Sequence, residues 1–424
     1  MHSFNVCVLG AGPAGMMAAI RAAEITGSVA LLDRNDSVGR KMLLTGNGRC
    51  NLTNSAPVDD FVLAFGSNGR FLRNAFGRFF SEDLLSFFQE RGVTFRTERH
   101  GRVFPDGGSS GTILQALKDG LSHAGVEVML NSDVRDIIRS DALLINLRDG
   151  RQISSMKLLI AAGGASYPQT GSTGDGFRLA GDLGHTIEPV GPGLVPLETR
   201  EGFVKALMGL TLTSVAARYL VAGKWRKTAV GSMLFTHFGI SGPMALDHSE
   251  TIARQLGAGP VSMQIDMKPD TDRAELDVKL RNEFQRSGAS LIKNLISHHI
   301  PRRMVEVVLG LSGIPEGTQC HQVTSEQRRT LITLFKSFPL TISGTRPMSE
   351  AMVTWGGVSL KEIDPRTMES RKVPGLYFCG EVLDLAATSG GYNLQAAFST
   401  GYVAGESAAS SLVDDRCSQE SVGE

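Results

Sequence analysis

The sequence predicts an α/β protein in which a discontinuous α/β domain is interrupted by a β-rich domain and then by a helical region. Three observations support this prediction. A βαβ pattern opens the chain, short β-like and then helical segments follow residue 190, and a glycine-terminated apolar strand returns near the C-terminus. The chain has 424 residues, more than the ~250–300 at which one hydrophobic core stops growing, so several domains are expected.

The first 190 residues alternate apolar strands with helices. The opening strand is β-branched and ends in glycine, and the phenylalanine-rich helix at 79–91 carries a wide apolar stripe. The expected strands are 4–9, 29–32, 126–130 and 158–161, and the expected helices are 14–26, 79–91 and 112–124. Strands that alternate with helices in this way are typical of a parallel sheet.

After residue 190 prolines punctuate short β-like runs, then polar helices follow, and strands return before the C-terminus. The expected strands are 212–220, 228–236, 340–342, 351–353 and 375–380, and the expected helices are 274–284, 288–299 and 325–337. This order predicts four parts: the interrupted domain at 1–190 and 345–412, a β-rich domain at 191–270 and 338–345, a helical subdomain at 271–337, and a polar tail at 413–424.

Composition narrows the classes of function. The 43 Lys and Arg balance the 43 Asp and Glu, so no global field would hold a polyanion or a membrane surface, and any nucleic-acid site would have to be local. The 5 cysteines are widely spaced and lack a CxxC pair, which argues against a disulfide framework and a zinc site. Glycines interrupt the apolar start, and no stretch reaches ~18 uninterrupted apolar residues. We therefore expect a soluble, cytoplasmic protein without a metal or a membrane partner.

A glycine-rich turn after the first strand predicts a dinucleotide site. The sequence GAGPAG at 10–15 fits GxGxxG, follows a strand and opens a helix, and Asp33 stands at the end of the next strand. Gly10 permits the tight turn, Gly12 allows the backbone to approach a pyrophosphate, and Gly15 allows close helix–sheet packing. The helix N-terminus would stabilise the phosphates, and Asp33 would accept hydrogen bonds from a ribose. A turn without a ligand is the weaker alternative in this context.

The C-terminal part favours FAD over NAD as the tightly bound cofactor. No second GxGxxG stands between a strand and a helix, whereas GEVLD at 380–384 follows a strand and precedes a glycine pair and a helix that starts near Asn393. In flavoproteins of the glutathione-reductase type, this pattern places an Asp, here Asp384, on the ribityl chain. It also places a helix N-terminus near the pyrimidine ring of the flavin. An acidic surface turn is the alternative.

Four long segments resemble the HI0933-like, or BaiN-like, flavoprotein family. They are GRKMLLTGNGRCNLTN (39–54), GGASYPQTGSTGDG (163–176), MLFTHFGISGP (233–243) and GLYFCGEVLDLAATSGGYNLQAAFSTGYVAG (375–405). They span nearly the whole chain in the family's order. The resemblance implies an FAD-dependent oxidoreductase with a doubly wound FAD-binding domain of glutathione-reductase type, an inserted β-barrel-like domain and a small helical domain. Family members are linked to the reduction of conjugated C=C bonds, one in bile-acid steroids and another in a uracil ring of large-subunit ribosomal RNA.

The same resemblance implies a set of FAD-binding positions. They are Gly10, Gly12, Ala14, Gly15, Asp33, Arg34, Arg40, Lys41, Val134, Gly163, Gly380, Asp384, Asn393 and Leu394. Asp33 is a departure, since the family more often has Glu there, but an Asp should still reach the ribose. Arg40 and Lys41 also suit a phosphate or a reduced flavin as charge partners. Surface charge beside Asp36 is the alternative for these two cations.

Cys50 is the candidate catalytic acid. Reduction of an activated C=C bond requires a proton as well as a hydride, and Cys50 lies in a glycine-rich loop beside Arg49, a cationic neighbour that could lower its pKa. A small buried cysteine that packs the loop is the alternative, and the sequence favours it slightly. His237, Tyr167 and Tyr392 are further candidates.

The expected function is transfer of hydride from NAD(P)H through FAD to an activated C=C bond. NAD(P)H would bind transiently, because the chain lacks a separate nicotinamide domain. The acceptor could be a uracil of ribosomal RNA or a small enone or steroid-like molecule. Zero net charge favours the small molecule, whereas the family's presence in ordinary bacterial cytoplasm favours RNA modification. A non-catalytic flavin redox sensor is the alternative from another class, and the dense loop of Arg, Lys, Asn and Cys at 40–50 argues against it.

Overall fold

The computed structural model describes residues 2–420, and the side chains of residues 2–413. The chain divides into two compact units, residues 1–193 with 348–424 and residues 194–347, which we call the first and the second unit. The tail expected at 413–424 falls on the end of a helix that runs to Glu420, and its last four residues lie outside the described part.

A seven-stranded sheet organises the first unit, in the order β6-β2-β1-β9-β8-β7, with β19 also paired to β9. Its strands are β1 (His2–Leu9), β2 (Val29–Leu32), β6 (Glu127–Met129), β7 (Val134–Arg139), β8 (Leu143–Leu147), β9 (Gln152–Ile160) and β19 (Leu376–Phe378). The strands β6, β2, β1, β9 and β19 are parallel, whereas β7 and β8 are antiparallel. The sheet forks at β9, because residues 152–155 pair with β8 and residues 158–160 pair with β19.

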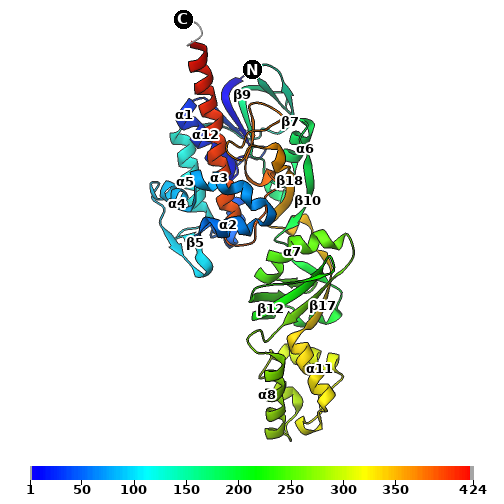
Figure 1. The fold of residues 1–424 in the computed structure, drawn as a ribbon. Coiled ribbons are helices and arrows are strands. Elements are labelled where there is room, and N and C mark those ends of the chain that lie inside the picture. Colours follow the sequence, from blue (N-terminus) through cyan, green and yellow to red (C-terminus); the bar gives the residue numbers. More distant parts are fainter. Residues whose placement is uncertain (1, 421–424) are drawn as a thin grey trace. The chain divides into compact units, whose positions relative to one another are not determined.

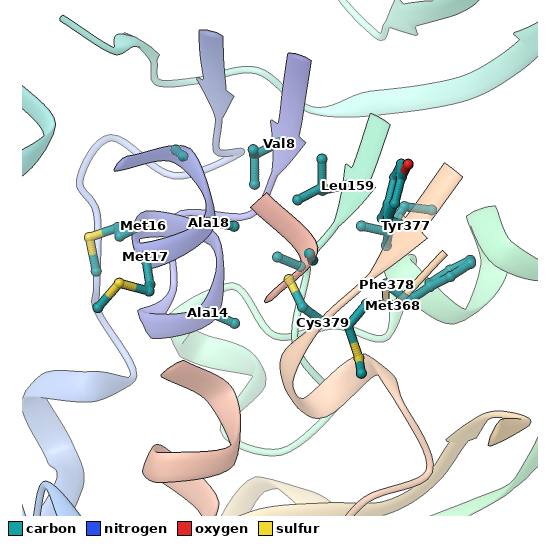
Figure 2. Close-up of a cluster of buried hydrophobic side chains, with 14 of the residues drawn as sticks. Val8, Ala14, Met16, Met17, Ala18, Leu159, Met368, Tyr377, Phe378 and Cys379 are labelled. Atoms are coloured by element: carbon teal, nitrogen blue, oxygen red, sulfur yellow. The ribbon is translucent and has the colours of Figure 1, made fainter. Parts of the chain in front are cut away.

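The core of the first unit joins the two ends of the chain. Helix α1 (Pro13–Thr26) lies alongside α12 (Tyr392–Glu420) (Figure 1). Glycines make this close approach possible, because a Cβ on Gly401 would lie 2.3 Å from the carbonyl oxygen of Ala14, and a Cβ on Gly405 would lie 2.2 Å from that of Ala18. Figure 2 shows side chains of α1 and of β1, β9 and β19 in one buried cluster. Parallel strands buried on both faces explain the continuous apolar runs of the sequence.

Smaller elements complete the first unit. They are α2 (Val58–Ala64), α3 (Arg73–Arg78), α4 (Ser81–Gln89), α5 (Ser110–His123), α6 (Asp175–Asp182), the sheet of β3 (Thr53–Asn54), β4 (Phe95–Thr97) and β5 (Arg102–Pro105), and the pair β10 (Ile187–Gly193) with β18 (Val353–Val358). The strand expected at 351–353 is wrong in position. Ala351 and Met352 follow a 3-10 turn and are not in a strand, and β18 starts only at Val353.

The second unit contains a closed ring of six strands, which confirms the β-barrel-like insertion. The strands are β11 (Leu197–Thr199), β12 (Thr211–Val221), β14 (Gly231–Phe235), β15 (Gly239–Ser241), β16 (Val261–Asp266) and β17 (Phe338–Thr345), and β13 (Lys224–Lys227) adds a hairpin to β12. The ring closes because β12 pairs with β14 on one side and with β16 on the other. Closure leaves no unpaired edge in the ring.

Five helices accompany the barrel within the described residues: α7 (Pro243–Leu256), α8 (Arg273–Arg286), α9 (Ile292–Ile296), α10 (Arg302–Ser312) and α11 (Ser325–Lys336) (Figure 1). One hydrophobic cluster runs through both the strands and these helices. The helix expected at 288–299 is wrong in extent, because Leu291 is extended and bridges Gln319, so that α9 begins only at Ile292. Among the described residues, no helix is long and apolar enough to cross a membrane.

Candidate cofactor site

A cavity in the first unit opens where β1 and β2 end. Its lining combines the glycine turn after β1, the residues after β2, the loops at 39–42 and 161–173, and segments from near the C-terminus. Twelve of the predicted positions line it: Gly10, Gly12, Ala14, Asp33, Arg34, Arg40, Lys41, Val134, Gly163, Gly380, Asn393 and Leu394. The carboxyl ends of strands are the usual ligand site of open α/β sheets. The fold therefore brings most of the predicted set to one place.

The N-terminus of α1 faces this cavity without a side-chain cap. Gly12 is the N-cap residue and accepts no side-chain partner, and Pro13 occupies the first helical turn. A Cβ built on Gly12 meets no atom within 4 Å, so Gly12 borders open space. Gly10 has a φ of +103°, and a Cβ there would lie 2.5 Å from the carbonyl oxygen of Ala161. Bare backbone N–H groups at a helix N-terminus suit a phosphate, so this geometry fits the pyrophosphate of FAD.

Asp33 organises the same turn. Its Oδ2 accepts a hydrogen bond of 2.7 Å from the backbone N–H of Ala11, and its Oδ1 accepts from the backbone and the side-chain amide of Asn35 at 2.9 Å each. A carboxylate oxygen carries two lone pairs, so Oδ2 retains one for a ribose hydroxyl. Asp33 thus holds the glycine turn in shape and still lines the cavity.

Carboxylates already pair the two predicted arginines. Arg40 forms an ion pair with Asp36 and donates to the hydroxyl of Ser37 at 3.1 Å, and this arginine lowers the pKa of Asp36. Arg34 pairs with Asp175 and lies 3.4 Å from Asp133. The alternative interpretation of Arg40 as charge beside Asp36 therefore matches its contacts. Both arginines line the cavity, and the charge of each guanidinium group is already balanced by a neighbouring carboxylate.

Lys41 joins the N-terminal and the C-terminal parts of the site. Its Nζ lies 2.6 Å from Oε2 of Glu381 and donates to Oγ of Ser166 at 2.6 Å. Oε1 of Glu381 accepts from the backbone N–H of Thr354 at 2.7 Å and from Oγ of Ser166 at 3.2 Å. Lys41 and Glu381 both line the cavity with side chains that are 21% exposed. Glu381 was not among the predicted site residues. Its position directly after Gly380, a predicted cofactor contact, could have suggested it.

The C-terminal segment reaches the cavity through Gly380 and the start of α12. Gly380 has a φ of +74° and donates its backbone N–H to the hydroxyl of Thr400. The side-chain amide of Asn393 accepts from the N–H of Ala387 at 2.9 Å and donates to its carbonyl at 3.1 Å. Asp384 and Gly15 are not among the lining residues. The carboxylate of Asp384 instead accepts from the amide of Asn68 at 2.9 Å, so its assignment to the ribityl chain stays a prediction.

Cys50 lies behind the cavity wall. Its side chain is fully buried, its φ is +58°, and it is not among the lining residues. Burial raises the pKa of Cys50 to about 12, against a smaller lowering by the hydroxyl of Thr45. The expectation that Arg49 lowers this pKa is wrong, because Arg49 pairs with Glu98 and stacks on Phe104. The catalytic assignment of Cys50 itself stays a prediction.

The other candidate proton donors also lie outside the lining. Tyr167 adopts a left-handed backbone with a φ of +51°, and Tyr392 contacts the edge of Phe61 with ring centroids 4.7 Å apart. His237 belongs to the second unit, where its ring lies against Phe238. None of the three is among the cavity residues in the described part of the chain.

Comparison with known proteins gives relatives along nearly the whole chain. The chain is 32% identical over 409 residues to a 3-dehydro-bile acid delta(4,6)-reductase of Clostridium scindens, covering 96% of this chain and 99% of the relative. It is 31% identical over 402 residues to a ribosomal RNA dihydrouridine synthase of Escherichia coli, covering 95% and 97%. A ribosomal RNA dihydrouridine synthase of Haemophilus influenzae is 32% identical over 410 residues, covering 95% and 97%.

Solved structures share the fold at low identity. A flavocytochrome c3 fumarate reductase superposes with a TM-score of 0.51 at 16% identity, covering 96% of this chain and 78% of the other. A 3-ketosteroid-delta4-(5alpha)-dehydrogenase of Rhodococcus jostii superposes with a TM-score of 0.50 at 14% sequence identity, covering 96% of this chain and 97% of the other. Residues 4–407 match the family described as HI0933-like protein Rossmann domain. The chain therefore belongs to the HI0933-like family of FAD-dependent oxidoreductases with a Rossmann domain.

Proposed function

We propose that this protein takes hydride from NAD(P)H and delivers it to an activated C=C bond in a uracil ring of ribosomal RNA, forming dihydrouridine. The observation that carries the proposal is an uncapped helix N-terminus in a glycine-lined cavity. It occurs in a chain that matches, over nearly its whole length, two relatives named ribosomal RNA dihydrouridine synthase and one named bile-acid reductase. FAD, when bound, supplies hydride transfer. The chain supplies binding, orientation and a proton.

The residues of the cavity divide these tasks. The N-terminus of α1 and the glycine turn would hold the pyrophosphate, and Oδ2 of Asp33 would accept from a ribose hydroxyl. The ion pair between Lys41 and Glu381 links the loop at 39–42 to the segment after β19 at the cavity wall. Reduction of a C=C bond also consumes one proton. Cys50 is the predicted donor. Lys41, whose ammonium donates to Ser166 and lines the cavity, is a second candidate.

A small enone or steroid-like acceptor is the second candidate, because the bile-acid reductase is as similar as the RNA-modifying relatives. The distribution of charge favours RNA. Residues 194–347 carry 19 Lys and Arg against 13 Asp and Glu, so the second unit has a net charge of +6 inside a chain of net charge zero. Zero net charge of the whole chain therefore does not exclude a polyanion, because the second unit has a net positive charge and the rest of the chain a net negative one.

Ribosomal RNA from a strain that lacks the gene tests the proposal. Mass spectrometry of nucleosides should show one dihydrouridine fewer in large-subunit RNA than in the parent strain. Purified protein with FAD and NAD(P)H should restore that residue in RNA from the deletion strain. Unchanged RNA in both experiments, together with turnover of a conjugated steroid ketone, would replace RNA by the small acceptor.

Anaerobic mixing with NADPH and with NADH separates the enzyme from a redox sensor. We expect rapid bleaching of the flavin absorbance by at least one of the two donors, followed by reoxidation on addition of the RNA. Slow bleaching without turnover on either acceptor would favour the sensor.

A further inference from the structure

We propose that a basic groove on the outer face of the barrel in the second unit binds the phosphate backbone of RNA, and that Trp225 beside it stacks on an unpaired base. We define the groove by its lining residues Ala216, Ala217, Arg218, Lys227, Thr228, Val230, Gln264, Asp266, Pro269, Arg273, Lys336 and Ser337. The inference rests on the proposed RNA acceptor, because it assigns the surface that would hold that substrate.

Strand register places the cations on the outer face of the barrel. Along β12, Val215, Ala217 and Tyr219 are buried, so the alternating Arg218 points outward. Arg218 lies opposite Lys227 of β13 and opposite Gln264 of β16. Directly opposite residues of antiparallel strands share a face, so these side chains share the groove.

The groove holds more positive charge than its own carboxylate neutralises. Its charged lining consists of Arg218, Lys227, Arg273 and Lys336 against Asp266 alone. Lys336 pairs with Asp266 at 2.6 Å and donates to two backbone carbonyls at 2.7 Å each, so this pair is self-contained. The remaining three cations form no ion pair in the described part of the chain. Arg218 contacts the amide of Gln264 and the ring of Trp225, and Arg273 contacts the hydroxyls of Thr333 and Ser337. They are available to an anion.

The β12–β13 hairpin extends this surface with an aromatic ring. All four residues of β13, Lys224 to Lys227, are exposed, and Trp225 is 42% exposed. The guanidinium of Arg218 lies 4.8 Å from the centre of the Trp225 ring. Trp225 lies opposite Leu220 in the register, on the same face of the hairpin as Arg218 and Lys227. Unpaired cations beside an exposed aromatic ring are the combination that binds phosphates and stacks bases in single-stranded nucleic acid.

Charge and aromaticity together favour RNA over other anions. A metabolite phosphate would need only the three cations and would leave Trp225 without a role. Single-stranded RNA can bind the cations through its phosphates and stack a base on Trp225, and the net positive charge of the second unit attracts the rest of its backbone. A uracil that is reduced must also be unpaired, and unpaired loops are the parts of RNA whose bases stack on aromatic side chains.

Binding of protein-free large-subunit ribosomal RNA from the deletion strain, measured over a range of KCl concentrations, tests the surface with the FAD-loaded protein. Arg218→Gln/Lys227→Gln should weaken affinity about tenfold or more near ~0.1 M KCl. The slope of log affinity against log salt should become shallower by roughly 0.7–0.9 for each cation that contacts a phosphate. Trp225→Ala should weaken affinity roughly 5- to 150-fold with little change of that slope.

Lys205→Gln/Arg302→Gln is the matched control, because both residues are exposed cations of the same unit that lie outside the groove and the hairpin. It should bind RNA as the unchanged protein does, and all variants should be reduced by NAD(P)H at the unchanged rate. Equal RNA affinity of the groove variants and the control would overturn the inference even if dihydrouridine still forms. If neither the unchanged protein nor any variant formed dihydrouridine, but the groove variants still bound RNA more weakly than the control, only the proposed reaction would be overturned.

Discussion

Cys50 shows how burial decides the chemistry of a single residue. A cationic neighbour in sequence suggests a reactive thiolate, yet the side chain is fully buried and its pKa is raised to about 12. A thiol in this environment stays protonated across the physiological range. Its left-handed φ of +58° also places it at a tight bend of the loop, where a small side chain fits. The geometry therefore favours a packing role, which a substitution can separate from catalysis.

Cys50→Ala should lower stability by about 1 kcal/mol through the small cavity that it leaves, and should weaken FAD retention because the loop lines the cofactor cavity. Stopped-flow measurement of the two half-reactions should then show both changing together. Selective slowing of the oxidative half-reaction by ~10²–10⁴-fold, with normal flavin reduction and normal FAD binding, would instead identify Cys50 as the acid.

The turn between β1 and α1 shows how one element combines folding and binding. Its glycines have different neighbours, because a Cβ on Gly15 would lie 1.9 Å from the carbonyl oxygen of Gly10, whereas a Cβ on Gly12 meets open space inside the cavity wall. The φ of Gly12 is −81°, which any residue adopts. Gly15 therefore serves packing, and Gly12 keeps room for a ligand.

Gly12→Ala and Gly15→Ala should separate these roles. Gly12→Ala should leave the melting temperature of the FAD-free protein unchanged but raise the Kd for FAD, because the added methyl group occupies the approach of the pyrophosphate. Gly15→Ala should lower the melting temperature without FAD, since backbone must move to relieve the contact. Calorimetry of the FAD-free proteins and fluorescence titration with FAD make the comparison. Equal FAD affinity of Gly12→Ala and the unchanged protein would contradict the placement of the cofactor.

At the scale of the whole molecule, three buried thiols make the first unit sensitive to alkali. Burial raises the pKa of Cys50 and of Cys379 to about 12, and raises that of Cys7 further. Unperturbed thiols, as in the unfolded chain, ionise near pH 9. Between these values the folded state holds more protons than the unfolded state. The contribution of the protonated thiols to the free energy of unfolding is therefore complete below about pH 9 and is lost as the pH rises toward 12.

The free energy of unfolding in urea should therefore fall above about pH 9, by about 1.4 kcal/mol per pH unit for each of these thiols. Titrations near pH 8.5, 9.5 and 10.5 under reducing conditions measure the slope. Cys50→Ala is the control, because it removes one thiol and should make the slope shallower by that amount. A slope that Cys50→Ala leaves unchanged would mean that Cys50 ionises within the folded protein.

The sequence by itself determined the local features of this protein. The strand, glycine turn and helix at residues 4–26, the strand before Gly380 and the helix that starts at Tyr392 follow from short-range patterns. These features depend on backbone conformations that a few neighbouring residues specify.

The tertiary structure decided what depends on partners far apart in the chain. Lys41 meets Glu381 340 residues away, and Arg34 meets Asp175 141 residues away, so the sequence could not show which cations are already neutralised. Closure of the barrel depends on the pairing of β12 with β16, and the same pairing sets Arg218 beside Gln264 in the groove. Burial of Cys50 is likewise a property of the assembled core. Charge pairing, desolvation and sheet closure are all set by distances in space, which spacing along the chain does not fix.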